Sequence, residues 1–246
     1  MSTRSTNRSV LKNGLKIQWL GHSGFRIVSP RGKILYIDPW LEHPRTPVGA
    51  KPVTAADIVV VTHGHFDHLG NTIEIASRTN ATVVTNFEIS LFLKSKGISE
   101  SHLHGINKSG SVSIDGIDMT MVHAEHSSGI TDGDRVIEGG SAAGFIIKFE
   151  NGYTVYHTGD TGLFGDMKTI ARIYKPQLLM VCIGGYYTMD PLEASEAVRL
   201  VKPKVVIPMH YGTYPILSGT PDDLKKRIGR SVNTRIVALE PGEVLE

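Results

Sequence analysis

Short hydrophobic runs separated by turn residues make up the first hundred positions of the chain. The run at 57–62 is apolar without alternation, which is typical of a strand covered on both faces. Asp38–Pro39 ends the strand before it, because a residue that precedes proline is biased away from regular continuation. We predict strands at 16–20, 25–28, 33–37, 57–62 and 81–85, and helices at 72–79 and 88–96. This half therefore begins as a meander and continues in α/β order.

The second half of the chain repeats this order. We predict strands at 111–114, 118–122, 143–149, 153–157, 178–183, 204–209 and 234–239, and helices at 163–174, 191–201 and 221–228. Asn151–Gly152 is typical of a hairpin turn. Two such halves predict two sheets packed face to face with helices outside, a four-layer αββα sandwich of the α/β class. We predict one domain over 1–246, in which 1–15 form a flexible polar tail.

Composition narrows the range of functions. Of the 246 residues, 40% are hydrophobic and 20% charged, as in globular domains, and a formal charge of +2 predicts no attraction to nucleic acid or membranes. No apolar run reaches the ~18 residues of a membrane-spanning helix. The basic, Ser- and Thr-rich start lacks the apolar segment of a secretion signal. We therefore predict a cytoplasmic protein that acts on a small-molecule substrate, without nucleic-acid or membrane partners.

The segment THGHFDHLG directly follows the apolar strand at 57–62 and contains His63, His65, Asp67 and His68. Histidines at i and i+2 near a strand end can turn toward one side, and the next loop can bring the other two residues to a neighbouring point. The H-x-H-x-D-H spacing therefore suits two adjacent metal centres better than one. Because Cys182 is the only cysteine, the metal ligands are nitrogen and oxygen, which suit zinc, iron, manganese or nickel in an open catalytic site.

This motif resembles the signature of the metallo-β-lactamase superfamily, whose fold is the αββα sandwich. Three later segments, AEHSS, HTGDT and IPMHY, resemble the contexts in which that family places its other ligands. His123 is an alternative to His126 in the first of them, but it lies inside the predicted strand. The resemblance implies one metal site made of His63, His65 and His126 and another made of Asp67, His68 and His210, with Asp160 bridging the two.

The resemblance also implies a cofactor and a reaction. The cofactor is a pair of divalent ions, with zinc as the first choice and manganese, nickel or iron as alternatives. The reaction is hydrolysis, in which a metal-bridging hydroxide attacks an ester, lactone or phosphoester of a small molecule. Asp67 would be the catalytic carboxylate that orients the hydroxide. His22 would be a proton donor or substrate contact at the cavity rim, unless GHSG is only a tight turn, and Asp38 would steady the histidine loop.

The segments WLGHS, IDP and IGGYYTMDP resemble one branch of the superfamily, which contains the bacterial ascorbate-phosphate lactonase and many metal-dependent hydrolases. We therefore expect a lactone or other ester as substrate, for example of a phosphorylated sugar acid, followed by a phosphodiester. A phosphodiesterase or nuclease and a diiron oxidoreductase are alternatives on the same site. The chain lacks the length for the flavin domain of diiron relatives and lacks a basic track for nucleic acid. Related folds often assemble, so a homo-oligomer is a possible state.

One segment has two interpretations. Gly184–Gly185 predicts a turn, although its N–H groups or the hydroxyls of Tyr186 and Tyr187 could stabilise an oxyanion. Tyr211, next to a predicted ligand, is either a packing residue or a substrate contact.

Other polar residues are expected to be structural. His157 is expected in the core or supporting a ligand, and Cys182 in a buried strand. Loops at 41–51 and 127–141 are expected to recognise the substrate. Three further histidines are expected in surface loops, without a role: His43, His102 and His104.

Overall fold

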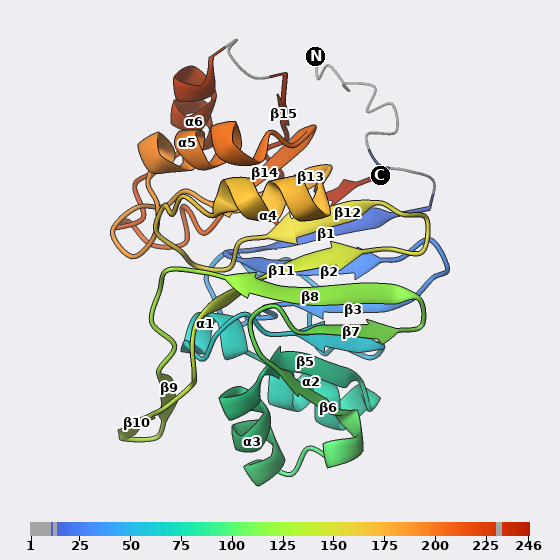
Figure 1. The fold of residues 1–246 in the computed structure, drawn as a ribbon. Coiled ribbons are helices and arrows are strands. Elements are labelled where there is room, and N and C mark those ends of the chain that lie inside the picture. The colour runs from blue at the N-terminus through green and yellow to red at the C-terminus, as the bar shows by residue number, and fades with distance from the viewer. Residues whose placement is uncertain (1–10, 12–13, 230–232) are drawn as a thin grey trace.

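Two seven-stranded sheets pack face to face, with helices on their outer sides (Figure 1). The structure is a computed structural model that describes residue 11, residues 14–229 and residues 233–246. This arrangement confirms the predicted αββα sandwich. No helix in the described residues is long and apolar enough to cross a membrane.

The first sheet is built from the first half of the chain and the last strand, in the order β16-β1-β2-β3-β4-β5-β6. Strands β1 to β3 pair antiparallel, and strands β3 to β6 pair parallel. The strands are β1 (Lys16–Gly21), β2 (Gly24–Val28), β3 (Ile34–Ile37), β4 (Ile58–Val60), β5 (Thr82–Asn86), β6 (Leu103–Ile106) and β16 (Val244–Leu245).

The second sheet has the order β15-β14-β13-β12-β11-β8-β7. It too is antiparallel in its first part, from β7 to β12, and parallel from β12 to β15. The two sheets therefore share the order that the repeat in the sequence predicts. The strands are β7 (Ser111–Ile114), β8 (Ile117–His123), β11 (Ala143–Lys148), β12 (Thr154–His157), β13 (Leu178–Cys182), β14 (Val205–Met209) and β15 (Arg235–Ile236); a separate hairpin contains β9 (Ile130–Asp132) and β10 (Arg135–Ile137).

Helices cover each sheet on one side. Figure 1 shows α2 and α3 beside β5 and β6, and α4, α5 and α6 beside the parallel strands of the second sheet. The helices α3, α5 and α6 begin at side-chain caps, because Asn86, Asp190 and Thr220 accept hydrogen bonds from backbone N–H groups of the first turn. The helices are α1 (Phe66–Leu69), α2 (Thr72–Thr79), α3 (Phe87–Ser95), α4 (Met167–Tyr174), α5 (Pro191–Val201) and α6 (Pro221–Ile228), with a 3₁₀ turn η1 (Glu100–His102).

The position of strand β4 in the fold explains why its sequence is apolar throughout. Ile58 and Val60 belong to the core between the two sheets, whereas Val59 and the following Val61 belong to a second core under α2 and α3. Both faces of the strand are therefore buried, as the lack of alternation predicts. The histidine segment begins where this strand ends, so its backbone starts from a fixed position.

Several elements were not predicted from the sequence. Strand β6 contains a histidine and a glycine, the strands β9, β10 and β16 have two or three residues, and α1 is a single turn within the histidine segment. The predicted polar tail is wrong at Leu11 and Leu15, which are buried in the core between the sheets. Residues 1–10 and 12–13 of that tail lie outside the described residues.

Candidate metal centre

Asp38 holds the histidine segment in place from the end of β3. Its buried carboxylate accepts hydrogen bonds from the backbone N–H of Thr62 at 2.8 Å, from the Thr62 hydroxyl at 2.7 Å and from His68 Nδ1 at 2.7 Å. Since that hydroxyl donates to Asp38, its oxygen can accept from His63 Nδ1, 3.0 Å away. Asp38 therefore orients one imidazole directly and another through Thr62, as predicted, and leaves both Nε2 atoms free for a metal.

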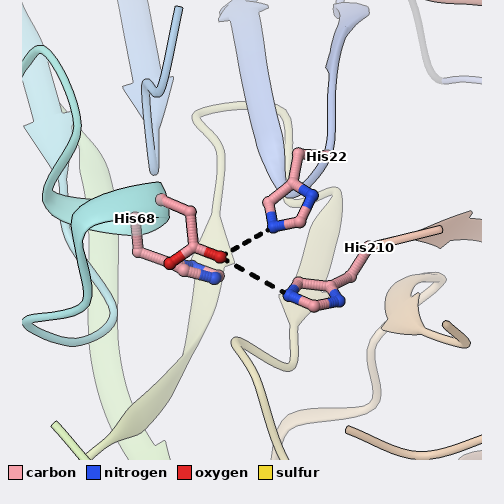
Figure 2. Close-up of side chains that lie close together, drawn as sticks. His22, His68 and His210 are labelled. Carbon is pink, nitrogen blue, oxygen red and sulfur yellow. Dashed lines mark hydrogen bonds and ion pairs between the residues drawn. The ribbon is translucent and has the colours of Figure 1, made fainter. Parts of the chain in front are cut away.

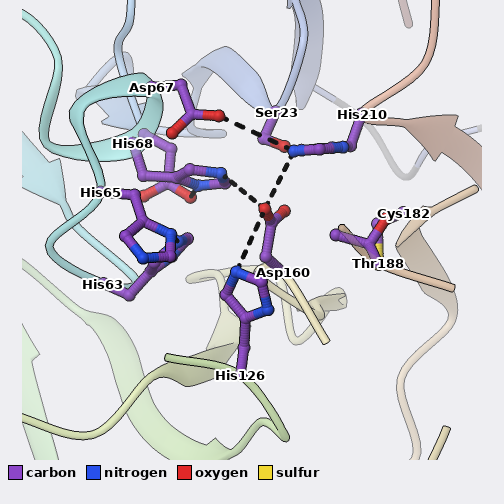
Figure 3. Close-up of polar contacts among 12 residues, drawn as sticks. Ser23, His63, His65, Asp67, His68, His126, Asp160, Cys182, Thr188 and His210 are labelled. Atoms are coloured by element: carbon purple, nitrogen blue, oxygen red, sulfur yellow. Dashed lines mark hydrogen bonds and ion pairs between the residues drawn. The ribbon is translucent and has the colours of Figure 1, made fainter. Parts of the chain in front are cut away.

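The second sheet contributes the other half of the cluster. His126 follows β8, Asp160 follows β12 and His210 follows β14. Asp160 Oδ2 lies 2.9 Å from His210 Nε2, 3.2 Å from His68 Nε2 and 3.8 Å from His126 Nε2. Figure 3 shows this carboxylate between the three imidazoles. The carboxyl ends of strands from both sheets thus meet at one point.

The described residues contain three groups of side chains whose potential ligand atoms lie within 4.8 Å of one another. Two of these groups each contain the residues of one predicted metal site. The third group shares His63 with one of them and His68 with the other. The groups are His63, His65 and His126; His22, Asp67, His68 and His210; and His63, His68 and Asp160. All seven predicted ligands are therefore brought together, and His123 is not among them.

The donor atoms fit a bound cation. Asp160 Oδ1 is buried and has no hydrogen-bond partner in the described structure, which is costly unless another group binds it. His63 Nε2 and His65 Nδ1 face each other at 3.0 Å, and His65 Nε2 lies 3.2 Å from the Ser127 hydroxyl. Imidazole and carboxylate groups without thiolate suit a divalent metal in a catalytic site.

Charges within the cluster are strongly coupled. Burial opposes ionisation of Asp160, but His210 and His68 outweigh it and hold the pKa of Asp160 well below its ordinary value. Burial also opposes the charge on His210, but attraction to Asp160 raises the pKa of His210 to about 9. Burial, together with repulsion from His68, holds the pKa of His63 well below its ordinary value. The metal-free cluster therefore combines ionised carboxylates with both charged and neutral imidazoles.

His22 lies deeper than predicted. It is buried rather than at a rim, and Figure 2 shows its ring and that of His210 pointing at one carboxylate, which belongs to Asp67. Burial and repulsion from His210 lower the pKa of His22 to about 4, so its ring is neutral at pH 7. His22 Nε2 therefore donates to Asp67 Oδ2 at 2.9 Å, and Nδ1 accepts from the Thr213 hydroxyl at 2.9 Å.

A cavity of about 590 Å³ opens onto this cluster. Its floor contains metal-ligand candidates, and its walls are formed by α1, the β9–β10 hairpin and two loops of the second half. The lining residues are His22, His65, Phe66, Asp67, His126, Ser127, Gly129, Thr131, Val136, Asp160, Tyr187, His210, Tyr214, Ile216 and Leu217. The predicted substrate loop at 127–141 contributes to the walls, whereas none of the residues at 41–51 lines this cavity.

Tight backbone contacts fix two ligand-bearing segments. A Cβ on Gly184 would lie 2.1 Å from the His210 carbonyl oxygen, and one on Gly159, whose φ is +63°, would lie 2.3 Å from the Ala143 carbonyl oxygen. Only glycine fits at either position without moving the backbone beside His210 or Asp160.

The Gly184–Gly185 segment is a turn. The N–H of Gly185 donates to the Met189 carbonyl and that of Tyr187 to the Gly185 carbonyl. These two N–H groups are therefore used within the turn, whereas an oxyanion contact by the Tyr187 hydroxyl stays a prediction. Tyr187 lines the cavity, whereas Tyr186 does not. Tyr211 stacks on Trp19 with ring centroids 5.3 Å apart and is not a lining residue, which supports its interpretation as a packing residue.

Of the remaining histidines, His43 corrects a prediction. It is buried rather than in a surface loop, and its Nε2 donates to the Leu20 carbonyl at 3.1 Å. His157 is buried as predicted, with Nε2 donating to the Ser23 carbonyl. His102 and His104 are half-buried in η1 and β6. Cys182 is buried in β13, where burial raises the pKa of its thiol to about 12.

Comparison with known proteins places this fold and cluster in a family. A model of the beta-lactamase superfamily domain matches residues 16–210, a range that includes every predicted ligand. The chain belongs to the β-lactamase superfamily. A UPF0173 metal-dependent hydrolase of Koribacter versatilis is 48% identical over 214 residues, which cover 87% of this chain and 91% of that relative. Within the superfamily, the chain is thus a metal-dependent hydrolase with a candidate His and Asp cluster for the metal.

Solved structures agree with this assignment. Igni18, a metallo hydrolase from the archaeon Ignicoccus hospitalis, superposes with a TM-score of 0.82 at 35% identity, covering 94% of this chain and 97% of that one. The metallo-β-lactamase fold protein YhfI from Bacillus subtilis gives a TM-score of 0.69 at 15% identity, covering 94% of this chain and 98% of that one, and shows the fold alone.

Proposed function

We propose that this hydrolase is dinuclear and cleaves an ester or lactone of a small molecule. The observation that carries the proposal is the third group of potential ligands, because His63, His68 and Asp160 connect two groups that could each hold an ion. A single ion would not need all seven side chains, since a divalent catalytic site usually has three protein ligands. Their location at the base of an open cavity supports catalysis rather than a structural site.

The proposed ligands follow the two groups. His63, His65 and His126 would hold one ion, and Asp67, His68 and His210 the other; Asp160 would contact both. Divalent ions there, with zinc as first choice, would polarise the bond under attack and lower the pKa of a water molecule. The chain itself fixes the imidazoles through Asp38 and holds Asp67 against His22.

We assign Asp67 the role of orienting the attacking water, and we assign His22 the role of positioning Asp67. His22 is neutral and its donating Nε2 is already used by Asp67, so it is poorly suited to donate a proton to a leaving group. The Thr213 hydroxyl donates to Nδ1 of His22 and so fixes the tautomer whose Nε2 donates to Asp67.

The proposal is tested by loading the purified protein with zinc, manganese, nickel or iron and measuring bound metal and hydrolysis together. We expect about two ions per chain and chelator-sensitive cleavage within a panel of lactones, carboxylic esters, thioesters and phosphodiesters. Absence of cleavage with every ion would refute the proposal. An iron pair that consumes oxygen would support the oxidoreductase alternative instead.

Replacing His22 with alanine is expected to lower kcat about 10- to 100-fold with little change in KM, because Asp67 loses the donor that orients it. Thr213→Val keeps the side-chain shape but removes the hydroxyl that fixes the His22 tautomer, so it should cause a smaller loss in the same direction. Steady-state kinetics on the best substrate of the panel measures both effects, and thermal unfolding checks that the variants are folded. Wild-type kcat in His22→Ala would exclude the positioning role.

A further inference from the structure

The walls of the cavity differ in chemistry from its floor. The floor contains the ionisable cluster, whereas Phe66, Val136, Tyr187, Tyr214 and Ile216 present apolar carbon from several elements of the chain. All five side chains are more than a third exposed to solvent. Exposed apolar surface gathered around a cavity is typical of a site that an apolar ligand covers.

Trp40 packs against two of these wall residues, Phe66 and Tyr214. Its ring lies at a right angle to that of Phe66, with centroids 5.4 Å apart, and its centroid is 6.2 Å from that of Tyr214. Trp40 is itself buried. Phe66 and Tyr214 are therefore held by a buried aromatic ring, so the apolar wall between them is formed before any ligand binds.

Lysine and arginine are missing from the described walls of the cavity. Two basic residues outside the cavity lining are already paired with other groups. The guanidinium carbon of Arg45 lies 5.6 Å from the ring centroid of Trp19, and Arg45 forms an ion pair with Glu240 at 3.3 Å. Lys96 forms an ion pair with Asp132 of the β9–β10 hairpin at 2.7 Å. A phosphate or carboxylate placed away from the metal cluster would therefore lose its hydration without gaining a counter-charge.

From these walls we infer that the substrate is a neutral carboxylic ester or lactone with an apolar chain or ring, not a phosphorylated one. This inference rests on the proposed hydrolase function. Water would add to the carbonyl carbon and the acyl C–O bond would break, so the products are a carboxylic acid and an alcohol, which for a lactone remain in one molecule. The apolar part would lie against the aromatic and aliphatic walls, and the carbonyl would face the His and Asp cluster. The first expectation from sequence, an ester of a phosphorylated sugar acid, is thereby replaced.

The zinc- or manganese-loaded enzyme tests this with p-nitrophenyl esters of increasing chain length. From acetate to octanoate, kcat/KM should rise by up to about fourfold for each methylene group that the walls bury. The butyrate ester should be preferred at least about tenfold over the hemisuccinate ester, in which a carboxylate replaces the terminal methyl group of the four-carbon acyl chain. p-Nitrophenyl phosphate and bis-p-nitrophenyl phosphate should be poor substrates. Preference for a charged or phosphorylated ester, or no dependence on chain length, would overturn the inference.

A lysine placed in the cavity wall tests the inference, and a lysine at a similar position outside the cavity is its matched control. Ile216→Lys should lower kcat/KM for the octanoate ester about tenfold and raise it for the hemisuccinate ester. Ile173→Lys is the control, because Ile173 is a similarly exposed isoleucine on α4 that does not line the cavity. It should leave both values unchanged. Equal effects of the two substitutions would contradict the assigned wall.

Binding separates this inference from the proposed function. Octanamide, a neutral apolar amide, should bind the metal-loaded protein in isothermal titration calorimetry and should bind Ile216→Lys more weakly, but not Ile173→Lys. If no ester is cleaved but octanamide binds in this way, the hydrolase proposal fails and the apolar cavity stands. If esters are cleaved and octanamide binding does not respond to Ile216→Lys, the hydrolase proposal stands and the substrate class is wrong.

Discussion

Replacing Asp160 with alanine is expected to abolish hydrolysis and to lower the amount of bound metal. One oxygen of this carboxylate lies 2.9 to 3.8 Å from three imidazoles, and the other is buried without a hydrogen-bond partner. In the proposed site both ions depend on Asp160. Because such ions supply several kcal/mol of transition-state stabilisation, we expect kcat/KM to fall at least about a thousandfold. Kinetics and elemental analysis of the same samples measure both effects.

Two further variants make this result interpretable. Asp160→Asn keeps the side-chain volume but removes the charge, so it should also lose metal and activity while the fold is retained. Asp132→Ala removes an exposed carboxylate paired with Lys96 and should change neither. In the metal-free protein, Asp160→Asn should also lower the pKa of His210, which attraction to Asp160 raises to about 9 against the effect of burial. Wild-type metal content and activity in Asp160→Ala would refute the bridging role.

The ligand set is implied by the resemblance of four segments to the superfamily, and the strand pattern predicts only that each of these segments follows the end of a strand. The apolar strand before His63 is buried on both sides, so the position of the segment after it follows from the sheet. Asp160 and His210 likewise follow strands whose buried residues are evident in the sequence. Parallel strands of one sheet end at the same edge, which brings Asp160 and His210 together. Their meeting with the histidine segment of the other sheet is implied by the resemblance and not by the strand pattern.

Other features depend on contacts that no local pattern records. His22 and Thr213 are 191 positions apart, and only the packed fold shows that they share a hydrogen bond. His43 lies in a segment rich in proline and polar residues, which predicts exposure, yet it packs under Gly21 and bonds the Leu20 carbonyl.

The cavity walls are the least predictable part of the site. They come from α1, from a hairpin of three-residue strands and from the loop that contains Ile216, none of which has enough residues for a recognisable period. Their common property is exposed apolar carbon around one cavity, and this requires knowledge of which loops meet. The proposed substrate class therefore rests on the cavity walls, whereas the reaction class rests on the motif and its family resemblance.

Replacing Asp38 with asparagine is expected to weaken metal binding about 10- to 100-fold although Asp38 contacts no metal in the proposed site. The amide can still accept from the Thr62 backbone, but its NH₂ group cannot accept from His68 Nδ1, and the negative charge that supports His68 is lost. Removing one partner of this buried pair should also lower the free energy of unfolding by about 3 kcal/mol. Chelator competition and urea unfolding measure the two effects.

The backbone around Asp38 provides a control for this substitution. Asp38 has φ +45°, and Asp115, whose side chain is 49% exposed, has φ +53°. Asparagine tolerates this left-handed conformation as aspartate does, so both substitutions change the side chain's charge and not the backbone strain. Asp115→Asn loses only a surface ion pair with Lys33 and should shift stability by less than about 1 kcal/mol, with metal affinity unchanged. Because the two positions share conformation and chemistry, equal losses in both variants would mean that Asp38 does not act through the buried imidazole of His68.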